Sequence, residues 1–98
     1  MKALIVGGDR IESIVRTLHA AGIERFDHWS GRKSGEQHQE VPRDTTLVVM
    51  LIDQVGHTFA GKVRHIADAQ GLPIIYSPRS RSRLTSQLLQ VKQRIALS

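Results

Sequence analysis

The sequence predicts an α/β fold in which a doubly wound parallel sheet of four strands is covered by helices on both faces. Two observations carry this prediction. Short apolar runs alternate along the chain with segments of helical periodicity, and the run Leu47–Ile52 is apolar at every position, as in a central strand buried on both faces. Right-handed crossovers then favour the strand order 2-1-3-4, that of a truncated flavodoxin- or receiver-like fold. The 98 residues are expected to form a single domain, 1–98.

The first half of the chain predicts two strands separated by one helix. Lys2–Gly7 is a short apolar run typical of a buried strand, and Ile23–Trp29 is a weaker one. Between them, apolar residues at helical spacing predict a helix over Arg10–Ala21. Asp9 is expected to cap that helix, with Glu12 three residues later as the second member of a capping box.

The second half predicts two helices and one further strand around the central run. Ser30–Asp44 is rich in Gly, Ser, Pro and charge, so we expect a loop, and loops of this length are usually functional or disordered. After the central strand, a helix is expected over Thr58–Gln70 and the fourth strand over Leu72–Tyr76. Ser77–Arg83 predicts a basic turn before the last helix, Leu84–Leu97.

The composition narrows the class of partner. Fourteen Lys and Arg residues against nine Asp and Glu give a net charge of +5, which favours an anion such as phosphate, carboxylate or nucleic acid. The sequence has no cysteine, which excludes thiolate chemistry and cysteine-ligated metal. No apolar run approaches the ~20 residues of a membrane span, and Met1–Gly8 is too short for a signal sequence, so we expect a cytoplasmic protein without a membrane partner.

The candidate site follows the central strand. In open α/β sheets, ligands bind outside the carboxyl ends of the strands. Asp53 comes directly after the apolar run, and Gly56 and His57 follow it. We therefore expect His57 at the carboxyl edge of the sheet, near a helix start whose partial positive charge favours the neutral imidazole that binds metals.

Four stretches carry motifs that suggest a family: VGGD (Val6–Asp9), DTTLVV (Asp44–Val49), DQVGHTFAGK (Asp53–Lys62) and GLPIIYSPR (Gly71–Arg79). Together they resemble the bacterial domain-of-unknown-function family 2325 over nearly the whole chain. The family pattern has a Ser-His pair after the third strand and a lysine in the next helix. His57 and Lys62 match this pattern, whereas Gly56 replaces the serine. The resemblance implies the fold and a site at the strand ends around His57, and it implies no particular activity.

The histidines suggest a cofactor held by imidazole. They are His19, His28, His38, His57 and His65. His57, Gly61 and His65 recur every four residues opposite the apolar helix face, and Gly61 leaves room for a flat group. Haem needs an axial imidazole, apolar walls and cations for its propionates. The residues expected to bind such a cofactor are Gly8, Trp29, His57, Gly61, Lys62 and His65, with His57 and His65 as metal ligands. The alternative is surface histidines without a ligand.

Two glycine- or arginine-rich segments suggest an anion instead. Arg79, Arg81 and Arg83 alternate with serines ahead of the last helix, and such a cluster can bind phosphate, so nucleotide or nucleic-acid recognition is an alternative function. A merely solvated turn is the other interpretation. Gly7 and Gly8 join a strand to a helix and could present free amides to an anion, or could simply form a tight turn that needs glycine.

A third hypothesis is a receiver-like phosphotransfer or interaction domain. Asp9 follows the first strand, Asp53 ends the third and Ser77 ends the fourth, as the acidic and hydroxyl groups of response-regulator receivers do. The sequence departs from that pattern because it has neither a fifth strand nor a lysine on it. No nucleophile, base and orienting group occur together, and no catalytic carboxylate pair is visible, so we do not expect an enzyme.

The last helix carries an apolar stripe with two interpretations. Leu84, Leu88, Val91 and Ile95 step by four, three and four residues, the spacing of a coiled-coil seam. The stripe either packs on its own sheet or joins copies, and we expect a homo-oligomer through this helix. The leading functional hypothesis is a non-enzymatic ligand-binding or sensor module with its site at the carboxyl edge of the sheet and haem as the first ligand to test.

Overall fold

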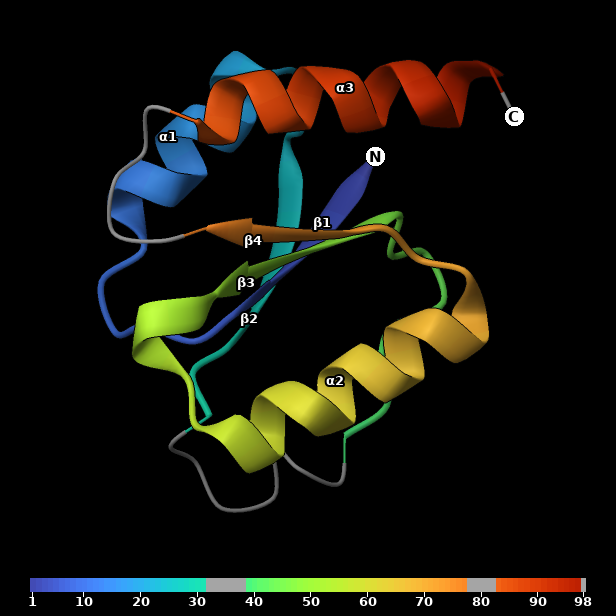
Figure 1. Ribbon diagram of the computed structural model, residues 1–98. Helices are drawn as coiled ribbons and strands as arrows, with labels where there is room; N and C mark the ends of the chain where they lie inside the picture. The colour runs from blue at the N-terminus through green and yellow to red at the C-terminus, as the bar shows by residue number, and fades with distance from the viewer. Residues whose placement is uncertain (32–38, 78–82, 98) are drawn as a thin grey trace.

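The computed structural model describes residues 1–31, 39–77 and 83–97. Four parallel strands form one sheet in the order β2-β1-β3-β4: β1 Lys2–Val6, β2 Arg25–Trp29, β3 Leu47–Leu51 and β4 Ile74–Ser77. Helices α1 (Glu12–Ala20) and α3 (Leu84–Leu97) cover one face, and α2 (His57–Gln70) covers the other (Figure 1). The predicted α/β class, parallel sheet and strand order are confirmed.

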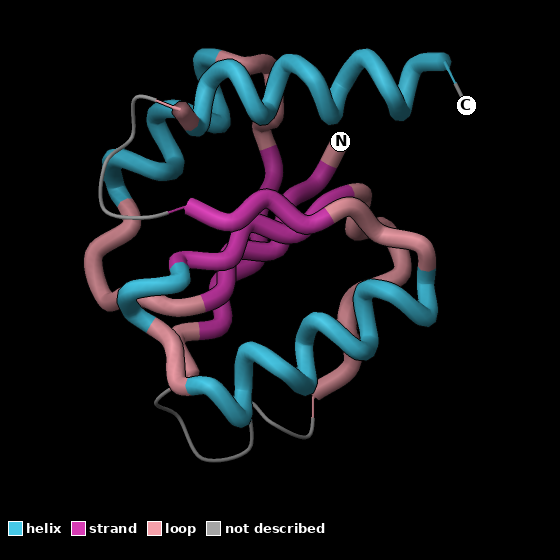
Figure 2. The backbone as a smooth tube through the Cα atoms, in the orientation of Figure 1, coloured by secondary structure: helices cyan, strands magenta, loops and turns pink. Residues whose placement is uncertain are grey.

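The sheet forms the middle of three layers (Figure 2), and its central strand contributes to the core on both sides. Along β3, Leu47, Val49 and Leu51 pack on the α1 and α3 side, while Val48 and Met50 pack on the α2 side. All five are at most 1% exposed. This two-sided burial is the reason why the strand is apolar at every position, since neighbouring side chains of a strand point to opposite faces.

Both helices that precede an edge strand end in the same hydrogen-bonded turn. At the end of α1, Gly22 has φ 85° and the N–H of Ile23 donates to Leu18 O at 2.8 Å. At the end of α2, Gly71 has φ 68° and Leu72 makes the equivalent bond. In this Schellman geometry, the apolar residue after each glycine is hydrogen-bonded to the helix end and is not part of the following strand. The strands therefore begin two residues later than the apolar pattern predicted.

The start of α1 differs from the prediction. The helix begins at Glu12, and Ile11 occupies the N-cap position without a side-chain hydrogen bond, so the predicted Asp9 cap and capping box are wrong. The reason lies in the preceding turn, where Gly7 and Gly8 have φ 97° and 78°. Because two successive residues adopt left-handed backbone angles, the chain leaves β1 in a turn and enters the helix only after Arg10.

The amino ends of the strands are joined by ion pairs. Lys2 Nζ lies 2.7 Å from Asp27 Oδ2 and 3.0 Å from Asp44 Oδ1, and Arg25 also pairs with Asp44. The hydrogen bond to Asp27, followed by that to Asp44, raises the pKa of Lys2 above its ordinary value. The hydrogen bond from Lys2 is the main cause that lowers the pKa of Asp44. The cluster ties β1, β2 and the segment before β3 together.

The apolar stripe of α3 belongs to the core of its own chain. Leu84, Leu88 and Val91 are at most 4% exposed and pack with Ile75 of β4, and Ile95 is partly buried against them. Of the two interpretations of the stripe, packing on its own sheet is therefore the one observed. Among the helices of the described residues, none is long and apolar enough to cross a membrane.

Candidate functional site

A polar hollow of about 440 Å³ lies at the carboxyl ends of β1, β2 and β3. The residues that line it follow those three strands: Gly8, Asp9, Ser30, Gly31, Asp53, Gln54, Val55 and Gly56. The side chains of Asp9 and Asp53 are exposed, so the hollow carries two carboxylates. A hollow thus exists at the sheet edge where the sequence predicted the site, and its lining is acidic rather than basic.

Backbone hydrogen bonds form the base of this hollow. The N–H of Gly7 donates to Trp29 O at 2.8 Å, and the N–H of Gly8 donates to Gln54 O at 3.1 Å. A Cβ at Gly8 would lie 2.8 Å from Gln54 Oε1 and 2.9 Å from Leu51 Cδ1. Both amides are therefore used inside the protein. The tight turn is the interpretation that fits, and an anion site built from these two amides is excluded.

His28 is the residue of this edge that the sequence reasoning missed. Its Nε2 lies 3.0 Å from Gly7 O and 2.9 Å from Gly8 O. Both partners are carbonyls, so Nε2 carries the hydrogen and donates to them. The half-buried ring thereby holds the glycine turn from the side of β2. The available signal was its position next to the end of β2, beside the expected end of β1.

The start of α2 adjoins the hollow. Gly56 lines the hollow and is the N-cap residue, with φ −70° and ψ 150° and no side-chain cap. His57 is the first residue of the helix, one residue earlier than predicted, and its side chain is exposed. A Cβ at Gly56 would meet no heavy atom within 4 Å. His57 is therefore at the carboxyl edge, as the sequence predicted, and accessible to solvent.

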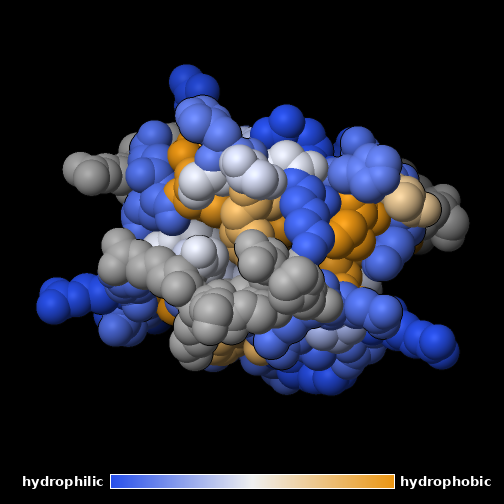
Figure 3. Space-filling model, turned by 90° about the horizontal axis from the view of Figure 1, so that it is seen from below, coloured by the Kyte–Doolittle hydropathy of each residue, from blue (hydrophilic) through white to orange (hydrophobic). Residues whose placement is uncertain are grey.

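The other predicted cofactor residues of α2 lie along its outer side. Lys62 and His65 are exposed, and a Cβ at Gly61 would meet no heavy atom within 4 Å. Seen from below Figure 1, hydrophilic residues predominate and hydrophobic ones form separate patches (Figure 3). His57 and His65 are eight residues apart, about 12 Å along the helix axis. Helical side chains lean toward the N-terminus, so His65 leans toward Gly61 while His57 leans away from it. The two imidazoles are on one side of α2 but too far apart to share one iron.

Trp29 does not face this region. The ring is 6% exposed and packs on Phe59 of α2, with the ring centroids 6.2 Å apart and the planes at 45°. The residue expected as a cofactor wall is therefore part of the core between β2 and α2. This correction follows from its place as the last residue of β2, where alternation directs the side chain under the helix.

Of the residues of the receiver hypothesis, Asp9 and Asp53 lie together at the hollow, whereas Ser77 is buried at the end of β4. Arg79 and Arg81 fall outside the described residues, whereas Arg83 is exposed immediately before α3. Asp53 lies in the short 3-10 turn Ile52–Gln54 after β3 and is exposed. Across the described ranges, no three His, Cys, Asp or Glu side chains are grouped so that they could hold a metal ion.

Comparison with known proteins gives a family. The family model described as "Uncharacterized protein conserved in bacteria (DUF2325)" matches residues 2–91. No curated protein and no solved structure matches the chain. The match includes all four strands, the hollow and α2, and it ends within α3. The chain therefore belongs to this bacterial family.

Proposed function

We propose that this chain is a non-enzymatic ligand-binding or sensor module, whose ligand binds between the carboxyl-edge hollow and the start of α2. The observation that supports this most is the adjacency of the two features. Gly56 lines the hollow, and the exposed His57 is the next residue. Ligand sites of α/β sheets are usually formed at this edge by loops from several strands, as this hollow is.

Haem is the ligand that we propose first, with His57 as the axial ligand. The porphyrin supplies four iron ligands itself, so the protein needs to supply only one or two. This requirement fits an edge where one exposed imidazole is present and no three ligating side chains converge among the described residues. Exposed Lys62 on α2 supplies a cation for the propionates. The carboxylates of Asp9 and Asp53 repel propionates, so the haem would bind with its propionates on the side of α2.

A haem titration of purified protein tests this proposal. We expect wild-type protein to give a sharp Soret band at one haem per chain, and His57→Ala to lose or strongly shift that band. His65→Ala tests the second predicted ligand separately. His19→Ala is the matched control, because His19 is also exposed but lies in the last turn of α1. Unchanged spectra and affinities in both the His57 and His65 variants would remove haem from consideration.

Anion recognition is the second candidate, and the exposed Arg83 together with the net charge of +5 favours it. Because the hollow carries two carboxylates, an anion would bind instead at the basic segment between β4 and α3. Retention on nucleic acid should then fall steeply with salt. The triple variant of Arg79, Arg81 and Arg83 to alanine should lose that retention while its melting temperature stays nearly the same. Labelling of Asp53 by an acyl phosphate would instead favour the receiver-like alternative.

We also propose that the module works as a homo-oligomer with α3 at the contact. The apolar stripe of α3 is occupied inside its own chain, so the contact would use the exposed side of the helix. β4 is the neighbouring element and lies at the end of the sheet order. Sedimentation of the protein as a monomer at high concentration would end this proposal.

A further inference from the structure

We infer that two copies of this chain pair through the outer edge of β4, antiparallel about a two-fold axis at Ile75. The two four-stranded sheets then continue into one. This inference rests on the proposed homo-oligomer and names its surface. It does not depend on the identity of the ligand.

The backbone of β4 offers hydrogen-bonding groups on its outer side. Val48 N–H donates to Pro73 O, so Pro73 and Ile75 direct their backbone groups toward β3. Backbone groups alternate between the two sides of a strand, so Ile74 and Tyr76 direct theirs outward. Among the described strands, β4 pairs with β3 alone. An antiparallel copy centred on Ile75 places Ile74 opposite Tyr76 of the second copy, which gives four hydrogen bonds by symmetry.

The side chains of this edge also match a copy of themselves. Ile74 and Tyr76 lie on the α2 side of the sheet, and the Tyr76 side chain is 39% exposed. In the antiparallel pair, each Tyr76 packs across the strand on Ile74 of the other copy, an aromatic and β-branched pair that stabilises sheets. β4 carries no charged residue, unlike the opposite edge strand β2, where Arg25 and Asp27 discourage added strands.

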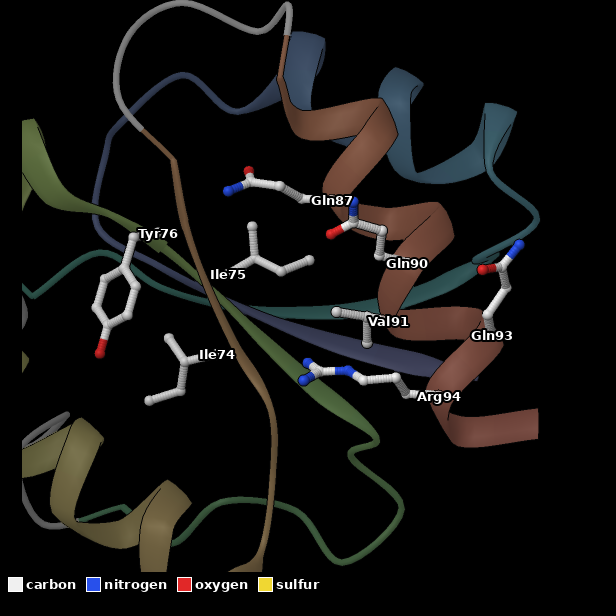
Figure 4. Close-up of a pocket in the computed structure, with 8 residues that line it drawn as sticks. All are labelled: Ile74, Ile75, Tyr76, Gln87, Gln90, Val91, Gln93 and Arg94. Carbon is white, nitrogen blue, oxygen red and sulfur yellow. The ribbon is translucent and has the colours of Figure 1, made fainter. Parts of the chain in front are cut away.

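On the other face, α3 extends past β4 and forms a groove of about 480 Å³ beside it (Figure 4). Gln87, Gln90 and Arg94 of α3 line the groove opposite Ile75. Gln87 Oε1 is buried and has no hydrogen-bond partner among the described residues. Because this oxygen is closed off inside its own chain, the exposed Gln90 is the amide of the groove that a second copy can reach. Glutamine amides both donate and accept, so they can pair with copies of themselves.

Charges on α2 select this arrangement of the second copy. The Arg64 guanidinium lies 5.9 Å from the Tyr76 ring centroid, and both Arg64 and Asp68 are exposed. Asp68 is one turn further along α2, which runs antiparallel to β4, so it lies level with Ile74. The two-fold axis places Tyr76 opposite Ile74 of the second copy. Arg64, which lies beside Tyr76, therefore faces Asp68 of the second copy. The pair of Arg64 and Asp68 forms twice across the two-fold axis. Because of this charge complementarity, we assign a second copy of the chain to the outer edge of β4.

A charge-reversal series tests the inference by sedimentation equilibrium. We expect wild-type protein to be dimeric, and Arg64→Asp or Asp68→Arg alone to weaken the dimer at least about ten-fold, because each creates two like-charge contacts. The double variant exchanges the partners and should restore wild-type affinity. If both single variants dimerise with the wild-type dissociation constant, this interface is wrong, although the proposed homo-oligomer still stands. Wild-type protein that stays monomeric would end both.

Proline substitutions at the two sheet edges give a second test. Tyr76→Pro removes the outward N–H of β4 without touching a bond to β3, so the dimer should be lost. Phe26→Pro is the matched control on β2. Phe26 has nearly the same exposure as Tyr76, 38% against 39%, and its N–H also points outward, because the backbone groups of Asp27 and Trp29 point toward β1. Circular dichroism verifies folding of both. A dimer lost in Phe26→Pro and kept in Tyr76→Pro would place the interface at β2 and contradict the inference.

Discussion

The two ends of the sheet are held together in different ways. At the amino end, ion pairs between side chains add to the backbone bond from Thr46 N–H to Lys2 O: Lys2 pairs with Asp27 and Asp44, and Arg25 pairs with Asp44. At the carboxyl end, the strands are joined through backbone groups of the glycine turn, to which His28 adds one imidazole. We therefore expect pH and salt to change the stability of the amino end, which contains the ion pairs. The stability of the carboxyl end should depend instead on the backbone geometry of the glycine turn.

The largest expected effect comes from adding one methyl group at the carboxyl end. Gly8→Ala places a Cβ at φ 78° and 2.8 Å from Gln54 Oε1. Left-handed strain and overpacking together should lower the free energy of unfolding by about 3 kcal/mol, measured by urea denaturation. Gly56→Ala is the control at the same hollow, since its φ is −70° and its Cβ meets no neighbour, so its only cost is that of alanine at an N-cap, which should be well below that of Gly8→Ala. Equal losses in both variants would contradict the role of the turn.

A smaller effect is expected from His28. His28→Phe keeps a ring but removes the donor to Gly7 O and Gly8 O. Leaving these carbonyls without that donor should cost about 1–2 kcal/mol in the same assay. His19→Phe, at an exposed position of α1, should change stability by much less. If the two variants behaved alike, the carboxyl end would not depend on this imidazole.

The smallest effect on stability is expected at the amino end, and it should depend on pH. The pKa of Asp44 is lowered in the folded chain, so its contribution is present above the unfolded pKa of about 4 and is lost as the pH falls through the folded value. The pKa of Lys2 is raised, so its contribution is present below about 10.5 and is lost at higher pH. Melting temperatures of wild type and Asp44→Asn should therefore differ near neutral pH and converge in acid. A difference that persists at pH 2 would contradict this account.

The fold could be predicted because its strongest signals are continuous. The run over Leu47–Leu51 is short and apolar at every position, which is the pattern of a strand buried on both faces. The boundaries could not be predicted to the residue, because Ile23 and Leu72 are apolar in a helix-ending turn as they would be in a strand. The start of α1 was missed because the capping pattern of Asp9 and Glu12 competes with the turn at the two preceding glycines, which depends on distant partners.

The candidate site could be predicted by place and only partly by residue. The position of His57 follows from the end of β3, which is a local property of the chain. The roles of His28 and Trp29 depend on which strand lies beside β1 and on which face α2 covers, and these are long-range contacts. The acidic lining of the hollow could not be predicted for the same reason. Asp9 and Asp53 are 44 positions apart in the sequence and come together only at the strand ends.

The backbone bonds beneath the hollow have a consequence for how this family can diverge. Because Gly7 and Gly8 hold the strand ends through main-chain atoms, the scaffold places few demands on the side chains above them. Asp9 and Asp53 are exposed and Ser30 is half-buried, so substitutions there change the charge and shape of the hollow. Under the proposed function, replacing a few residues of this lining would change the preference for a ligand while the backbone bonds beneath it are kept.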